Sequence, residues 1–155
     1  MTTKLTVSRI KPNPSGKDRS RYGGATAAQL GAEWVDFKNT SGIPFGLQNV
    51  ELFHLTYTGL QTSSAKVTGF SGSLGTGQTV RIHSGRVRDL SVLRKEDLDG
   101  ADHHIFTGRD SYVWNNSEGD TPSLWDVVTR SWIDRASYDR NPPEGAVLTR
   151  VGEKL

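Results

Sequence analysis

The chain of 155 residues contains no cysteine, a single methionine and no long apolar run. Without cysteine there is no disulfide, no thiolate ligand for zinc and no cysteine nucleophile, so stability must come from packing and hydrogen bonds. No stretch approaches the ~18 apolar residues that cross a bilayer, and the N-terminus from Met1 to Ser8 lacks the apolar segment of a signal peptide. These absences predict a cytoplasmic protein without membrane insertion.

An excess of charge of one sign is also missing. Nineteen Lys and Arg residues face seventeen Asp and Glu residues, which gives a net charge of +2. The hydrophobic content of 34% and the absence of long charge runs exclude a filament rod, a collagen-like chain and a wholly disordered one. The length then predicts one globular fold with one core, and the charge by itself indicates no nucleic-acid partner.

Short runs of β-branched and aromatic residues, interrupted by seventeen glycines, make up most of the sequence. The clearest strand is 78–84, where Val80 and Ile82 share one face while Arg81 and His83 share the other. This alternation predicts one buried and one solvated face. Between residues 47 and 57 the apolar positions change parity, which predicts a β-bulge near Leu52.

The other expected strands alternate in the same way and lie between turn signals. They are 5–7, 33–38, 65–70, 103–107, 111–115, 123–128 and 132–138. About nine short strands in a chain of this length predict an all-β fold, specifically an immunoglobulin-like two-sheet β-sandwich.

Three segments interrupt the strand pattern. Residues 11–31 contain two prolines and four basic residues, so we expect a long loop insert, partly mobile, with one helical turn at 25–30. Residues 85–100 favour a short helix at 90–98, with Asp89 as its cap. Residues 141–155 follow a proline pair and are predicted to form a C-terminal tail, which leaves 1–140 as the domain.

Several motifs occur in a characteristic order along the chain. They are Asn-Pro-Ser-Gly-Lys-Asp at 13–18, Glu-Trp-Val-Asp-Phe-Lys-Asn at 33–39, the run at 74–85, Val-Trp-Asn-Asn-Ser-Glu-Gly-Asp-Thr-Pro-Ser-Leu at 113–124, then Ile133-Asp134 and Tyr138. The pattern resembles the lamin-tail domain, the immunoglobulin-like module of nuclear intermediate-filament proteins that also occurs in bacteria as a separate module. The resemblance covers roughly residues 4–138 and implies a β-sandwich that acts as a non-catalytic interaction module. The chain departs from the family pattern in the insert before Glu33, in 85–110 and in 129–131, and it has no heptad rod.

Sites for nucleotides or catalysis are not indicated. Residues 72–79 differ from a phosphate-binding loop in having Gln78 where lysine is required, and a strand follows where a helix is needed. No Gly-x-Ser-x-Gly elbow is present, because Gly69-Phe70-Ser71-Gly72-Ser73 lacks its final glycine. We therefore expect neither a cofactor nor an enzyme, with an enzyme of unidentified reaction as the remaining alternative.

Metal ions have weak candidates. The acidic residues of 96–102, with Gly100 for a bend, offer oxygen ligands for calcium, but their spacing fits no full motif, and a solvated acidic loop is the simpler interpretation. His103 and His104 are adjacent, so on a strand they face opposite sides and each needs help from His54, His83 or a carboxylate to bind zinc. We predict no metal site.

The function expected from these observations is contact with a protein partner, made by an exposed sheet edge or by the loop 11–31. A sheet edge also permits a homodimer, and an exposed ring among Trp34, Trp125 and Trp132 would add a contact surface. The alternative is binding of nucleic acid or another polyanion, against which stands pairing with neighbouring acids. The residues that would form this basic cluster are Arg81, Arg86, Arg88, Arg94 and Lys95.

Overall fold

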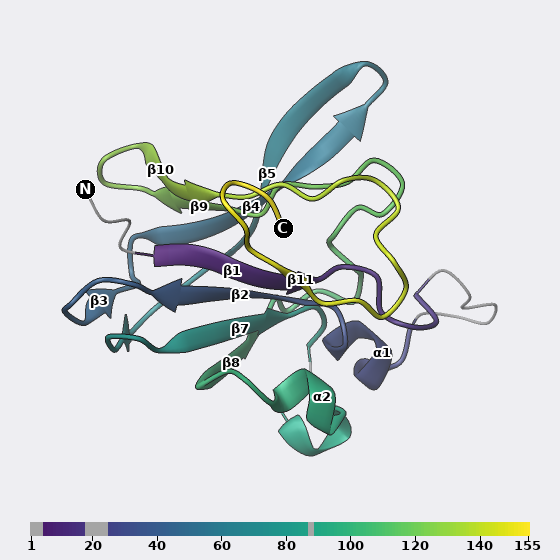
Figure 1. The fold of residues 1–155 in the computed structure, drawn as a ribbon, viewed down its shortest axis with the longest axis horizontal. Coiled ribbons are helices and arrows are strands. Elements are labelled where there is room, and N and C mark those ends of the chain that lie inside the picture. The colour runs from purple at the N-terminus through teal and green to yellow at the C-terminus, as the bar shows by residue number, and fades with distance from the viewer. Residues whose placement is uncertain (1–4, 18–24, 87–88) are drawn as a thin grey trace.

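Two β-sheets, whose strands are mostly antiparallel, face each other in the computed structural model, which describes residues 5–17, 25–86 and 89–155. The first sheet has the order β11-β1-β2-β7-β8 and the second has the order β10-β9-β4-β5 (Figure 1). The first consists of β1 (Leu5–Lys11), β2 (Trp34–Asn39), β7 (Thr79–His83), β8 (His103–Phe106) and β11 (Leu148–Thr149). The second consists of β4 (Val50–Thr58), β5 (Gln61–Gly69), β9 (Ser123–Asp126) and β10 (Ser131–Arg135), and β3 (Phe45–Gly46) pairs separately with β6 (Ser73–Leu74). The predicted all-β sandwich is confirmed.

The core lies between the two sheets and follows the alternation of the strands. Val80 and Ile82 of β7 are buried there, as predicted, together with Leu52 and Leu124 from the opposite sheet. The register of β4 against β5 shifts between Leu52 and Phe53, which confirms the expected bulge. The bulge turns successive apolar residues of β4 toward the required faces.

β8 runs parallel to β7, whereas the other strand pairs are antiparallel. A parallel pair needs a connection that crosses one face of the sheet. Here this connection contains the 3₁₀ helix η1 (Leu90–Val92) and the helix α2 (Lys95–Leu98), and we call residues 89–102 the flap. The expected helix at 90–98 is thus two short pieces separated by the extended Leu93, although Asp89 caps the first as predicted.

The helical turn predicted at 25–30, within the loop insert, is present as α1 (Ala27–Gly31). Thr26 and Gln29 form a capping box, since each side chain hydrogen bonds to the other residue's backbone N–H. Residues 111–115, by contrast, form no strand, and that prediction is wrong. The N–H groups of Val113 and Trp114 donate to the carboxylate of Glu33 instead of to a neighbouring strand.

The last fifteen residues are part of the fold rather than a tail. β11 pairs with the end of β1, and the segment runs back along the sandwich (Figure 1). Arg150 donates to both carboxylate oxygens of Asp134, at 2.7 and 3.1 Å, and to the carbonyl of Val7. Pairing of this kind requires an ordered chain end, so the expectation of a free tail at 141–155 does not hold.

The hairpin of β4 and β5 projects beyond the rest of the sandwich (Figure 1). Leu60 at its tip is fully exposed, and the outer half of β5 carries small polar side chains in solvent. In the described part of the chain, no helix is long and apolar enough to span a bilayer.

Candidate functional site

The outer face of the first sheet is covered by the flap. Arg81 and His83 lie on the face opposite Val80 and Ile82, as the alternation predicts, yet both are 0% exposed. Leu93 of the flap packs so closely on Gly31 that a Cβ there has no room. The predicted solvated face is therefore a buried polar layer, because the β7–β8 connection crosses it.

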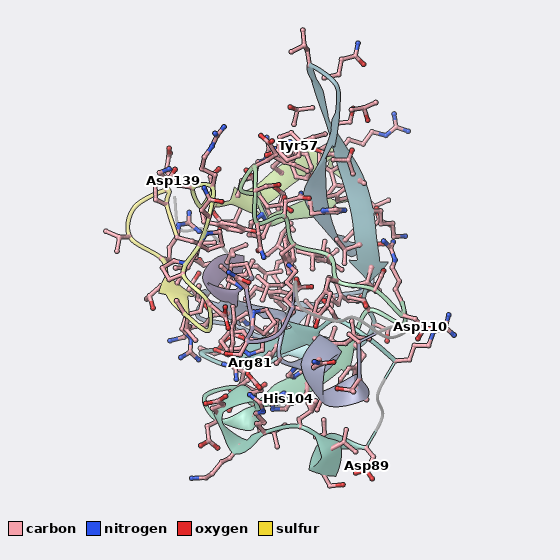
Figure 2. All side chains as sticks on the ribbon, turned by 90° about the vertical axis from the view of Figure 1, so that its right-hand side faces the viewer. Tyr57, Arg81, Asp89, His104, Asp110 and Asp139 are labelled. Carbon is pink, nitrogen blue, oxygen red and sulfur yellow. The ribbon has the colours of Figure 1, made fainter. Side chains whose placement is uncertain are left out.

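The flap is held by nitrogen donors on the sheet and oxygen acceptors on the flap. Lys11 Nζ lies 2.6 Å from Asp97 Oδ1, and the indole nitrogen of Trp34 lies 3.0 Å from the same oxygen. Arg81 donates to the backbone carbonyls of Asp97 and Asp99 at 3.1 and 2.8 Å. Figure 2 shows Arg81 and His104 beside one another under the flap. These contacts fix a segment that has few apolar anchors of its own.

Arg81 has no part in an exposed basic surface. Its guanidinium forms two hydrogen bonds to the Asp36 carboxylate, at 2.7 and 2.8 Å, and its Cζ lies 3.6 Å from the centroid of the Trp34 ring. Burial of the whole pair inside the layer overturns the placement of Arg81 in the predicted cluster. A strand residue on a polar face is buried when another segment covers that face.

The other members of the predicted cluster are exposed and paired where they are described. Arg86 pairs with Asp110, Arg94 with Glu96 and Lys95 with Asp99, while Arg88 lies outside the described residues. Exposed pairs of this kind contribute little to stability and leave the local charge nearly balanced. The structure thus gives no concentrated positive patch among the residues that it brings together.

Two histidines meet inside the polar layer. His83 Nδ1 lies 2.6 Å from the carbonyl oxygen of Gly31, and His83 Nε2 lies 2.8 Å from His104 Nδ1. The rings stack at a centroid distance of 5.1 Å. Burial lowers the pKa of His83 to about 4 and also lowers the pKa of His104. Both rings are therefore neutral near pH 7.

The described residues contain no group of three or more potential metal ligands. His103 and His104 face opposite sides of β8, as the sequence predicts, and His104 meets His83 in a hydrogen bond too short to admit an ion between the two nitrogens. In the acidic segment, Asp97 binds Lys11 and Trp34, while Asp102 accepts from the N–H of Thr79. These carboxylates thus serve separate structural contacts.

An open pocket of about 560 Å³ lies beside β8, and we call it the β8 groove. Its lining includes every residue from 102 to 106, and segment 68–74 forms the opposite wall. Successive strand residues point to opposite faces, so a hollow that touches five in a row must extend around the edge of the strand. Among the described strands of this sheet, β8 is the last.

The backbone of β8 offers unpaired groups to this groove. The N–H of Thr107 donates to the carbonyl of His83 in β7 at 2.9 Å, and in the register of this parallel pair His103 and Ile105 also bond to β7. The alternate residues His104 and Phe106 therefore direct their N–H and C=O groups away from β7. The partly exposed ring of Phe70 supplies apolar surface on the other side. The groove combines hydrogen-bonding edge groups with an apolar wall, which are the two elements needed to bind an extended peptide.

The beginning of the predicted loop insert is structural. Lys17 Nζ lies 2.5 Å from Glu33 Oε2 and also donates to the carbonyl of Trp114. Glu33 is wholly buried, and this burial raises the pKa of its carboxyl group, which the nearby Lys17 opposes. A hydrogen bond from Ser84 completes the contacts of the second oxygen. The pair ties the insert to the core, and the middle of the insert, 18–24, lies outside the described residues.

The Trp114–Leu124 motif is architectural, as predicted. Asp120 accepts from the N–H groups of Leu55, Asn115 and Thr121, and so it fixes the turn against β4. Gly119 has a φ of 77°, and a Cβ there would lie 2.5 Å from the carbonyl oxygen of Tyr138. Only glycine fits this position, because both the dihedral angle and the space exclude a side chain.

Of the three tryptophans that could offer an exposed ring, one lies in the buried layer and two lie at the surface. Trp34 is buried under Arg81, whereas Trp125 and Trp132 are half-buried on the outer face of the second sheet. Their rings pack edge-to-face at 4.7 Å, with Phe53 against Trp132 at 5.6 Å and Arg135 over the Trp132 ring. The rings of Trp125 and Trp132 therefore use much of their surface in contacts with each other and with Phe53 and Arg135.

The β8 groove and the His83–His104 contact were missed at the level of sequence. The groove joins segments some thirty residues apart, and no local pattern marks it. The adjacency of His103 and His104 is a usable signal for the second, because neighbouring strand residues point to opposite faces and one of the two must share the face of His83. No protein-family model matches the chain, and no curated protein matches it either.

Proposed function

We propose that this protein is a non-catalytic interaction module that binds an extended segment of a partner protein in the β8 groove. The observation that supports this most directly is the position of the groove along the open edge of β8, where a partner strand would find the outward N–H and C=O groups of His104 and Phe106. The β8 groove is a specific form of the expected contact through a sheet edge.

The lining of the groove indicates the chemistry of the partner segment. Side chains on one face of an added strand would meet Phe70 and Ile105, which are partly exposed, so alternate apolar residues fit there. Asp102 and His103 lie exposed at one end of the strand and provide a polar rim. The preferred partner is therefore an extended peptide with apolar side chains at every second position.

Other edges are less suited to specific recognition. β11 is two residues long, and the carbonyl of Lys66 on the edge of β5 already accepts from the side chain of Arg109. The exposed half of β5 has neither an apolar wall nor a groove beside it, so pairing with a second copy would bury little area. We retain the resemblance to the lamin-tail domain as a proposal, which is supported by the motifs that hold Lys17, Glu33 and Trp114 together.

Selection from a displayed library of random peptides tests this function. We expect enriched peptides with the alternating apolar pattern, whose binding is lost in Ser73→Trp, a substitution at an exposed residue in the wall. Ser63→Trp places the same bulk on the exposed part of β5 and should leave binding intact.

Three results would contradict the proposal. They are the absence of any enriched pattern, equal binding by Ser73→Trp and wild type, and loss of binding in Ser63→Trp alone. Self-association of the purified protein that competes with the peptide would assign the groove to a second copy instead.

A further inference from the structure

Lys17 is a buried primary amine, and one of its contacts is the side-chain amide of Asn116. The side chain of Lys17 is only 7% exposed. Its Nζ donates to the carbonyls of Pro12 and Trp114 at 2.8 and 2.5 Å, and it lies 3.4 Å from Oδ1 of Asn116. The amide carbon lies one bond, about 1.2 Å, from that oxygen. An amine nitrogen and a carboxamide carbon, the two reactants of an amide bond, are therefore held close together inside the fold.

Hydrogen bonds orient the side-chain amide of Asn116. Its Nδ2 donates to Oδ1 of Asn13 at 3.0 Å, and its Oδ1 faces Lys17. The backbone carbonyl of Asn116 accepts from the N–H of Asn141 at 2.6 Å, which fixes the turn that carries the side chain. The carbonyl end of the amide is thus directed at the amine, and its nitrogen is directed away from the amine at an acceptor.

Glu33 is the group that can take a proton from this amine. Its Oε2 lies 2.5 Å from Nζ of Lys17, which is within the reach of a general base. The residue is 0% exposed, and burial raises the pKa of its carboxyl group against the opposing effect of Lys17. The Ser84 hydroxyl and the N–H of Val113 donate to the other oxygen. The carboxyl group is therefore held in place, and its burial favours the neutral acid beside a neutral amine.

We propose that Lys17 and Asn116 join in an intramolecular isopeptide bond, with Glu33 as the catalytic base and acid. Glu33 takes a proton from the Lys17 ammonium, and the neutral amine attacks Cγ of Asn116. Glu33 passes this proton to Nδ2, the Cγ–Nδ2 bond breaks and ammonia leaves. The second proton lost by Nζ passes to Glu33 and then to the departing ammonia. An ammonium group and a primary amide thus become a secondary amide and an ammonium ion, and no further reactant is needed.

The bond closes a long loop in a chain that has no cysteine. It ties the segment after β1 to the Trp114–Leu124 motif, through two residues that are 99 positions apart. A cross-link over a loop of this length strongly restricts the unfolded chain. The isopeptide bond therefore takes the stabilising role of a disulfide, and it forms without an oxidant.

Intact-mass spectrometry of the purified full chain tests the bond without any variant. After incubation of the folded protein at neutral pH, the wild type should be lighter than its sequence by one ammonia. Trypsin should then release a branched peptide in which the segment 10–19 is joined through Lys17 to the segment 110–130, which has no internal lysine or arginine. The full sequence mass after incubation would overturn the proposal, as would an ammonia loss that fragmentation places at another asparagine.

Three variants assign the parts of the reaction. Lys17→Arg removes the amine but keeps a positive charge, and Asn116→Ala removes the attacked carbon, so both should have their full sequence masses. Glu33→Gln cannot take the proton and should slow the loss of ammonia by at least ~100-fold. Lys66→Arg is the matched control in the more exposed pair with Glu51, and it should keep the mass deficit. A deficit that persists in Lys17→Arg would contradict the bond, and loss of ammonia at the wild-type rate in Glu33→Gln would contradict the catalytic role of Glu33.

Discussion

Glu33 and Asp97 are carboxylates without solvent contact, and each fixes a connection between strands. Glu33 anchors Lys17 and the backbone of Val113, and Asp97 anchors the flap through Lys11 and Trp34. A buried pair of this kind gains little over apolar packing, but loss of one partner leaves the other charge buried and uncompensated. Single neutral substitutions at these positions should therefore be costly.

Glu33→Gln should lower the free energy of unfolding by roughly 3–5 kcal/mol, because the buried ammonium of Lys17 loses its counter-charge. Urea denaturation of the variant and the wild type measures this difference. Glu51→Gln is the matched control, since its partner Lys66 is half exposed, and the cost there should stay below about 1 kcal/mol. Equal effects of the two substitutions would show that the Lys17–Glu33 pair does not organise the insert.

Trp114→Ala should cost roughly 3–5 kcal/mol, because the indole is 4% exposed within the core and packs edge-to-face on His54. The same denaturation experiment measures the loss. Trp125→Ala removes a half-buried ring from the outer face and should cost clearly less. A nearly unchanged stability of Trp114→Ala would place that ring outside the core.

The alternation of apolar and polar residues predicted which face of the sheet a side chain lies on better than it predicted whether that side chain is exposed. Alternation correctly placed Val80 and Ile82 opposite Arg81 and His83. It failed on the environment of the polar pair, because what covers a strand face is decided by a connection elsewhere in the sequence. The predicted basic cluster lost Arg81 for this reason.

At the scale of elements, strands with clear alternation were predictable from the sequence, whereas their pairing partners and the segments that cover them were not. The strand at 78–84, the bulge at Leu52 and the turn at 25–30 all follow from local pattern. The segment 111–115 has the composition of a strand, yet its N–H groups are satisfied by a carboxylate eighty residues away. The parallel pairing of β8, and hence the groove, depends on the path of the flap, which no local signal describes.

Removal of residues 146–155 tests the role of the C-terminal segment as an element of the sheet. The end of β1 would lose its partner β11, and Asp134 would lose Arg150. We expect a loss of roughly 2–5 kcal/mol, seen as a clear drop in melting temperature. Arg150→Ala in the full chain should reproduce part of the drop, whereas an unchanged melt after truncation would mean that the segment is a tail after all.

At the scale of the molecule, stability should depend on pH through His83. Its folded pKa is lower than its unfolded value, so the unfolded chain binds an extra proton below about pH 6.5. Stability is complete above that pH and decreases as the pH falls toward 4, by roughly 3 kcal/mol in total. Denaturation of wild type and His83→Asn at matched pH values isolates this contribution, and parallel curves for the two proteins would contradict it.

The described part of the molecule is a sandwich in which the flap covers the outer face of the first sheet, a groove lies beside the β8 edge, and buried charges fix the long connections. The fold class was predictable from strand number and turn spacing. The site was not, because the groove depends on which edge remains unpaired and on which loop lies opposite it. The proposed interaction role rests on this edge and its groove.

The most direct measurement of the proposed role is amide hydrogen exchange at single-residue resolution, with and without a peptide selected on the protein. A strand that adds to β8 should strongly protect the N–H groups of His104 and Phe106, which face away from β7 in the free protein. Thr62 and Ser64 on the edge of β5 should be unaffected. Protection at β5 without protection at His104 and Phe106 would contradict the account, because the partner would then bind elsewhere.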